Sequence, residues 1–71
     1  MDRTILLQRL AQTERHAADG TRHVADQRKL IADLERNGRD TNFARDLLRQ
    51  FESLRELHVA DRDRLKKELK A

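Results

Sequence analysis

The side chains best suited to chemistry in this sequence are three histidines and the aspartates that follow them. Each histidine precedes an aspartate by three positions, in the pairs His16 and Asp19, His23 and Asp26, and His58 and Asp61. Residues three apart on a helix share a face, so each imidazole can lie beside a carboxylate. Imidazole and carboxylate together suit zinc and similar ions. The candidate metal ligands are therefore His16, His23, His58 and Asp61.

A second interpretation makes part of this group a polar layer inside a helical core. Buried polar residues in coiled coils fix register and partner choice. The residues of such a layer would be Gly20, Gln27, His58, Asp61 and Arg62. We favour this interpretation and expect no cofactor, because Cys is absent and the order is His-x-x-Asp rather than the Glu-x-x-His of two-metal carboxylate bundles.

Basic residues suggest phosphate binding as a third kind of chemistry. The chain carries 16 basic and 13 acidic residues, for a net charge of +3. The candidate contacts to nucleic acid are Arg39, Arg45, Arg49, Lys66 and Lys67. The two signs of charge are interspersed, which is typical of solvated helix faces. Phe43 and Phe51 are the two aromatic residues available to stack on bases, so nucleic acid is an alternative and not the favoured partner.

Motifs of enzymes and of membrane proteins are absent from the sequence. There is no glycine-rich phosphate loop or nucleophile elbow, and a chain this short is not expected to enclose a substrate. No apolar run approaches the ~20 residues that span a bilayer. The apolar run near the start, Ile5–Leu7, is too short for a signal peptide. The expectation is a cytoplasmic protein without enzymatic activity.

A seven-residue repeat indicates the helix that must position His16 and His23. Apolar residues recur at heptad position a, namely Leu10, Ala17, Val24 and Ile31. Position d is then occupied by Leu6, Thr13, Gly20, Gln27 and Leu34. Two such lines predict a helix that packs against a partner helix along a narrow seam. This helix is predicted to span residues 3–36.

A turn signal separates the first helix from the one that must carry His58. Gly38 can adopt the left-handed conformation that ends a helix, and Asp40 or Thr41 can cap the next. The second helix is predicted over residues 42–70, with the core line Ala44, Phe51, His58 and Leu65 flanked by Leu47, Leu48 and Leu54. A short loop makes long helices antiparallel neighbours. The expected fold is all-α, a two-helix antiparallel hairpin that forms a single domain over residues 1–71.

The position of the turn also predicts which residues face each other. With its centre near residue 39, facing residues have numbers that add to roughly 78. His58 is then expected to be buried against Gly20.

Self-association is predicted because the two helices carry more apolar surface than one seam can cover. Ile5, Leu7 and Leu30 lie beside the first seam, and Leu48 and Leu57 lie outside the second core line. Two hairpins are expected to form a homodimeric four-helix bundle. The alanine line, Ala11, Ala18, Ala25 and Ala32, would allow their close approach.

Several short motifs spread over most of the chain carry a family resemblance. They are Gly20, His23 and Val24, the turn from Leu34 to Thr41, Leu47-Leu48 with Phe51-Glu52, and His58 with Arg62-Asp63-Arg64-Leu65. In these motifs the chain resembles a group of short, mostly uncharacterised alphaproteobacterial helical-hairpin proteins with no assigned function. The resemblance implies a bacterial cytoplasmic protein and implies no activity.

The function expected from the sequence is that of a helical interaction module. Such a module would self-associate and bind a protein partner that the sequence does not name. A hairpin that binds RNA or DNA is the alternative, and a His/Asp metal-binding bundle is the less favoured third hypothesis.

Overall fold

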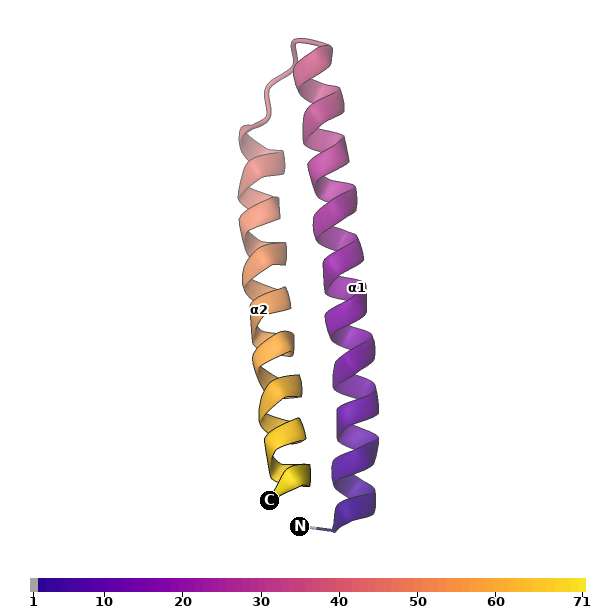
Figure 1. The fold of residues 1–71 in the computed structure, drawn as a ribbon. Coiled ribbons are helices and arrows are strands. Elements are labelled where there is room, and N and C mark those ends of the chain that lie inside the picture. Colours follow the sequence, from indigo (N-terminus) through magenta and orange to yellow (C-terminus); the bar gives the residue numbers. More distant parts are fainter. Residues whose placement is uncertain (1) are drawn as a thin grey trace.

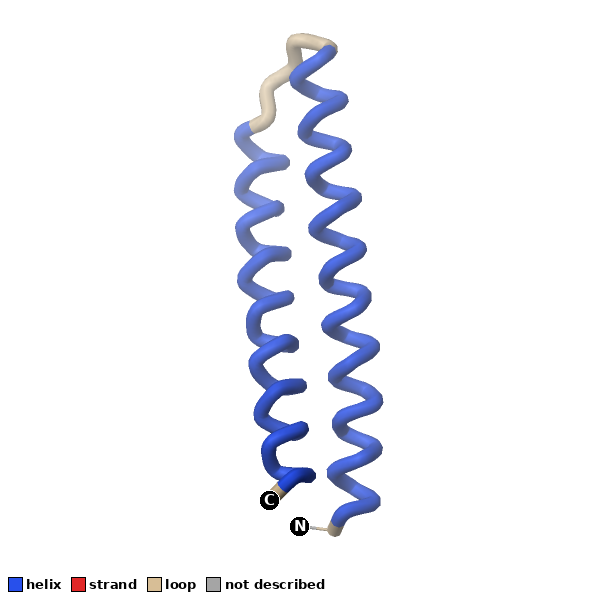
Figure 2. Tube along the Cα trace, viewed as in Figure 1, coloured by secondary structure: helices blue, strands red, loops and turns tan. Residues whose placement is uncertain are grey.

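The computed structural model describes residues 2–71 as two long helices, α1 over Arg3–Arg36 and α2 over Asn42–Lys70. The helices run antiparallel, so the two ends of the chain lie together at the end opposite the turn (Figure 1). The loop between them is short, and all the other described residues except Asp2 and Ala71 are helical (Figure 2). The Cα atoms extend over 53 × 14 × 14 Å. The predicted hairpin and the predicted bounds of both helices are confirmed.

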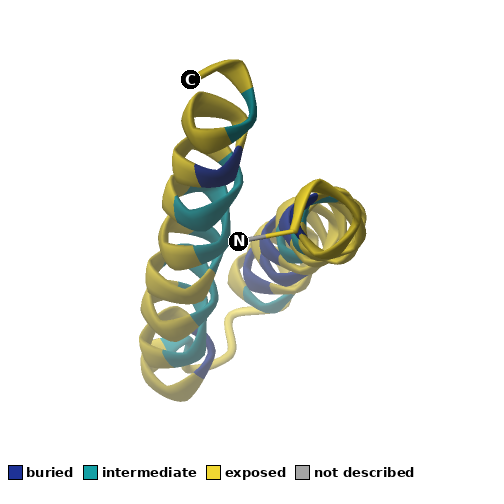
Figure 3. Cartoon of the chain, turned by 90° about the horizontal axis from the view of Figure 1, so that it is seen from below, coloured by how far each residue is buried: buried dark blue, intermediate teal, exposed yellow. Residues whose placement is uncertain are grey.

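The core is a narrow seam between the two helices. Its buried apolar residues are Leu6, Ala17, Val24, Ile31, Ala44 and Leu65. In α1, every residue at positions a and d from Leu6 to Leu34 is buried or half-buried, as the heptad pattern predicts. Seen along α1, the buried and half-buried positions of each helix face the other helix, and the outer surfaces are exposed (Figure 3).

The seam of α2 differs in part from the predicted one. Ala44 and Leu65 are buried, and Phe51 and His58 are half-buried. Leu54, which we expected beside this line, is exposed over half of its surface. The second seam line of α2 is instead Leu48, Arg55, Arg62 and Leu69, all half-buried. Two arginines therefore occupy the middle of the seam, where their aliphatic stems can pack while their charged ends reach water.

The end of α1 is closed by the glycine motif that the sequence predicts. Gly38 has a φ of +66°. Its N–H donates to the carbonyl oxygen of Glu35 at 3.1 Å, and the N–H of Arg39 donates to that of Leu34 at 2.9 Å. These two bonds are the Schellman pattern, which satisfies carbonyl groups that a helix end leaves free.

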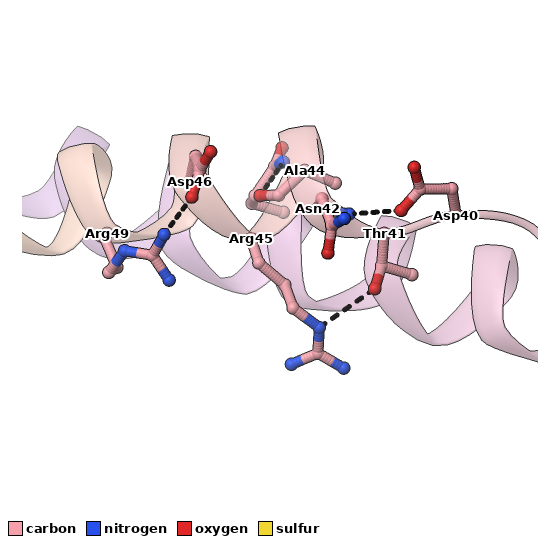
Figure 4. Close-up of polar contacts among 8 residues, drawn as sticks. Asp40, Thr41, Asn42, Ala44, Arg45, Asp46 and Arg49 are labelled. Atoms are coloured by element: carbon pink, nitrogen blue, oxygen red, sulfur yellow. Dashed lines mark hydrogen bonds and ion pairs between the residues drawn. The ribbon is translucent and has the colours of Figure 1, made fainter.

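Side chains of the loop support the first turn of α2. Asp40 accepts a hydrogen bond from the backbone N–H of Asn42 at 2.9 Å, and the Thr41 hydroxyl accepts one from Arg45 Nε at 3.0 Å (Figure 4). Thr41 stands at the cap position, but its side chain bonds no backbone N–H of the helix. Of the two predicted caps, Asp40 is therefore the one that satisfies a free backbone donor.

The register between the helices differs from the predicted one by about a turn. Gly20 lies against Arg55, three positions before the His58 that we expected there. His58 faces His16 instead. The reason is visible in the loop, which runs back along the last turn of α1 before α2 begins (Figure 1). Because the loop runs back beside α1, α2 begins farther from the turn end of the hairpin than it would after a tight turn.

Candidate histidine face

One lateral surface of the hairpin, here called the histidine face, collects most of the candidate residues. Two adjoining grooves form it. The first, of about 260 Å³, is lined by His16, Asp19, Gly20, His23, Leu54 and His58. The second, of about 320 Å³, is lined by His23, Asp26, Gln27, Leu30 and Phe51. The two grooves meet at His23, so the histidine face is continuous along the middle of the hairpin.

Heptad geometry explains why these side chains share a face. His16, His23 and Leu30 recur at seven-residue intervals, at position g beside the seam. Position g lies on one side of the a and d lines, and position e lies on the other. From α2, Phe51 and His58 are themselves seven residues apart. A line from each helix therefore meets on the same side of the seam.

The histidine rings make two contacts across the seam. The rings of His16 and His58 lie edge to face, with their centroids 5.0 Å apart and their planes at 63°. The ring of His23 lies 5.7 Å from that of Phe51, centroid to centroid. His16 and His23 are exposed and His58 is half-buried. His58 and Gly20 line the same groove, as predicted, but His58 is half-buried and contacts His16, and Arg55 is the residue nearest to Gly20.

The predicted polar layer is divided among different levels of the hairpin. Gln27 is buried, and its Nε2 donates to the carbonyl oxygen of Ala44 at 2.9 Å, near the start of α2. His58 lies farther along, against His16. Arg62 lines a groove on the opposite side of the seam. The buried amide and the histidines are thus separate features, since no single layer contains them all.

The metal candidates do not form a complete coordination site. Among residues 2–71, no three His, Cys, Asp or Glu side chains lie close enough together to hold an ion. His16 and His58 are brought together, but His23 contacts Phe51. Asp61 forms an ion pair with Arg64 at 3.2 Å. Of the four predicted ligands, the structure therefore brings together two, His16 and His58.

The basic candidates lie in two separate groups. Arg39, Arg45 and Arg49 are near the turn, where Arg45 pairs with Glu35 and Arg49 pairs with Asp46. Lys66 and Lys67 are near the other end of α2. Residues 11–60 contain nine basic and nine acidic residues, so the excess of three positive charges falls in the remaining residues, with seven basic and four acidic. The fold therefore makes no single basic surface from the five candidates.

The opposite side of the seam, here called the charged flank, has a different composition. Glu14, Ala17, Ala18, Thr21, Val59, Arg62 and Lys66 line a groove there. One heptad farther along the same side, Arg28 of α1 and Glu52 of α2 form an ion pair at 3.2 Å. Charged side chains from both helices therefore lie on this flank, whereas the histidine face presents rings and leucines.

Two features of the site escaped sequence reasoning. Arg55 packs over Gly20, and its position seven residues after Leu48 and seven before Arg62 was the available signal. Leu54 joins the groove of His16 and His58 to a third one on the outer side of α2, which also contains Leu57. Spacing along α2 could have identified Arg55, but the grooves depend on both helices.

Two general findings complete the description of the chain. Neither α1 nor α2 has a stretch apolar enough to cross a lipid bilayer, over the residues described above. No protein-family model, curated protein or solved structure matches this chain.

Proposed function

We propose that this hairpin is a non-enzymatic interaction module that self-associates through its histidine face. The observation that carries the proposal is the gathering of exposed leucines on and beside that face. Leu30 is 46%, Leu54 50% and Leu57 64% exposed. Leu30 lines one groove of the histidine face, Leu54 lines the other, and Leu57 adjoins Leu54. Burial of such side chains is a main source of association free energy, at about 25 cal/mol per Å².

The shape of the hairpin supports the same proposal. A compact monomer of 8.4 kDa is expected to expose about 4,600 Å², whereas this chain exposes 5530 Å². Its radius of gyration is 16.2 Å, against about 11 Å for a compact domain of this length. The excess surface, roughly 900 Å², is similar to the ~800 Å² that each partner buries in a standard interface. A dimeric four-helix bundle would restore the usual proportion of buried surface.

The contrast between the two sides of the hairpin indicates which side lies in the interface of the proposed dimer. On the charged flank, an interhelical ion pair and exposed polar side chains are well suited to water. The alanine line lies toward that flank, because Ala18 shares its groove, and its four alanines are exposed. Alanine offers little apolar area compared with leucine or phenylalanine. The histidine face is therefore the surface that gains more by being covered.

Sedimentation equilibrium at micromolar concentration tests this proposal. The wild-type chain should sediment at twice its 8.4 kDa mass, and a Leu54→Glu, Leu57→Glu variant should sediment as a monomer. The matched control, Ala18→Glu with Ala25→Glu, adds the same charges to the other side and should remain dimeric. A dimer lost in the control and kept in the leucine variant would place the interface on the alanine line. A monomeric wild-type chain would contradict self-association and leave the histidine face for a different protein.

A further inference from the structure

We propose that His16 and His58 form a two-histidine site for a divalent ion of the zinc type, joining α1 to α2. This goes beyond the proposed interaction role and does not depend on it, because both ligands come from one chain. The two rings already face each other across the seam with centroids 5.0 Å apart. One is supplied by each helix, so a bound ion would connect the helices near the middle of the hairpin.

The distance between the rings fits coordination to one ion. Zinc binds imidazole nitrogen at about 2.0–2.1 Å with tetrahedral geometry, which places the centres of two bound rings roughly 5 Å apart. The 5.0 Å between the ring centroids of His16 and His58 matches this separation. What must change is the tilt of the rings about their side-chain torsions, so that a nitrogen of each points to a common centre. His16 is exposed and His58 is half-buried, so neither ring is locked by a surrounding core.

Asp19 lines the same groove as both rings, three residues after His16 on the same side of α1. Its carboxylate contacts Arg22 at 3.4 Å, and no three His, Cys, Asp or Glu side chains among residues 2–71 lie close enough together to hold an ion. The two histidines are therefore the protein ligands of the proposed site, and water would complete the coordination in the single hairpin.

The competing explanation is that the two rings make only an aromatic contact. Edge-to-face ring pairs at such distances are common in proteins and need no ion. The two explanations predict different behaviour when metal is added. A plain ring contact is indifferent to zinc, whereas a two-histidine site gains stability because the ion binds the folded hairpin better than the unfolded chain.

Calorimetric titration of the untagged chain with Zn²⁺, and absorption spectroscopy with Co²⁺, test the site. The expected result is one ion bound per chain, a rise in the melting temperature with added zinc, and a Co²⁺ spectrum typical of nitrogen and oxygen ligands. His16→Ala and His58→Ala should each lose the binding and the rise in melting temperature. His23→Ala is the matched control, because its ring contacts Phe51 instead, and it should bind as the wild type does.

The outcomes that would overturn the site are equally definite. They are no binding of either ion, binding that survives both His16→Ala and His58→Ala, or loss of binding in His23→Ala alone. One ion per two chains, with a doubled mass on adding zinc, would also overturn it, because the ion would then join chains instead of helices. If His58→Ala lowers helicity, His58→Gln keeps a polar side chain there and should still abolish binding. Because calorimetry and absorption spectroscopy detect the bound ion, a failure to bind zinc would leave the sedimentation test of self-association unaffected.

Discussion

At the scale of single residues, the two glycines of this chain meet different physical requirements. Gly38 has a φ of +66° with no heavy atom within 4 Å of where a Cβ would stand, so its requirement is conformational. Gly20 is inside α1, where glycine costs about 1 kcal/mol relative to alanine. A Cβ there would stand 3.3 Å from Arg55 Cβ and 3.4 Å from Arg55 Cα. Its requirement is therefore the close approach of the two helices.

Replacement of Gly38 by alanine should destabilise the hairpin by about 1–2 kcal/mol, the cost of a left-handed backbone for a residue with a Cβ. The surroundings are open, so no steric clash should add to this cost. Urea denaturation followed by circular dichroism measures the change. Gly38→Asn is the control and should cost less, because asparagine tolerates this conformation better. Equal stability of the alanine variant and the wild type would mean that the turn does not depend on a positive φ.

Replacement of Gly20 by leucine should lower the free energy of unfolding by roughly 1–3 kcal/mol, because Arg55 blocks the space that the new side chain needs. Gly20→Ala should be close to neutral, since the gain in helix propensity of about 1 kcal/mol is offset by crowding against the α2 backbone. The same denaturation experiment compares both variants with the wild type. Stabilisation by leucine would show that α1 and α2 are not in contact at this level.

At the scale of the elements, α1 is capped at both ends, and the seam between α1 and α2 contains both apolar and polar residues. Asp2 caps α1 by accepting a hydrogen bond from the N–H of Thr4 at 3.0 Å, and the Schellman pattern closes its other end. The seam is apolar near the ends of the hairpin and contains Gln27, Arg55 and Arg62 between them. Polar residues within a seam cost stability but restrict the ways in which two helices can pair. The polar residues of this seam therefore restrict how α1 and α2 can pair and lower the free energy of unfolding of the hairpin.

Gln27 offers a direct measure of that cost. Its side chain is buried and donates to the carbonyl oxygen of Ala44 at 2.9 Å, an oxygen that can keep its bond within α2 when the amide is removed. Gln27→Leu should therefore stabilise the hairpin by roughly 1 kcal/mol, because leucine at position d gains apolar burial and leaves no unpaired donor.

Thermal unfolding of the Gln27→Leu variant, compared with Gln50→Leu, checks this expectation. Gln50 is exposed on α2, so its replacement by leucine should change stability by less than about 0.5 kcal/mol. A lower stability of Gln27→Leu would mean that the amide bond to α2 contributes more than the burial of a leucine.

At the scale of the whole molecule, the hairpin is a thin rod with two unlike sides. Its core consists of one seam, so large side chains beside that seam are left in contact with water, Leu30 and Leu54 among them. These leucines fall on the histidine face, and interhelical charges fall on the charged flank. An amphipathic rod of this kind has one side that is suited to solvent and one that gains free energy by being covered.

If the rod self-associates as proposed, its melting temperature should rise with protein concentration, because a dimer is favoured over unfolded monomers by mass action. Calorimetry over a hundredfold range of concentration measures this. In the Leu54→Glu, Leu57→Glu variant the melting temperature should not vary with concentration. A wild-type melting temperature that is constant across the range would contradict the dimer.

The sequence by itself determined the elements of this protein and the faces they turn to each other. Heptad spacing in α1 predicted its seam from Leu6 to Leu34, and Gly38 with Asp40 predicted where one helix ends and the next begins. These features depend on residues close together in the chain. Helical periodicity and the conformational freedom of glycine act locally, so a local pattern is enough to predict them.

The tertiary structure alone decided how far one helix is shifted along the other. A shift of about one turn keeps the same seam facing the partner, so periodicity cannot distinguish the predicted register from the one observed. The path of the loop makes that choice, and it places Arg55 over Gly20 and His58 against His16. The histidine pair and the grooves beside it therefore depend on how far the loop runs back along α1 before α2 begins. The spacing of residues within either helix does not predict that distance.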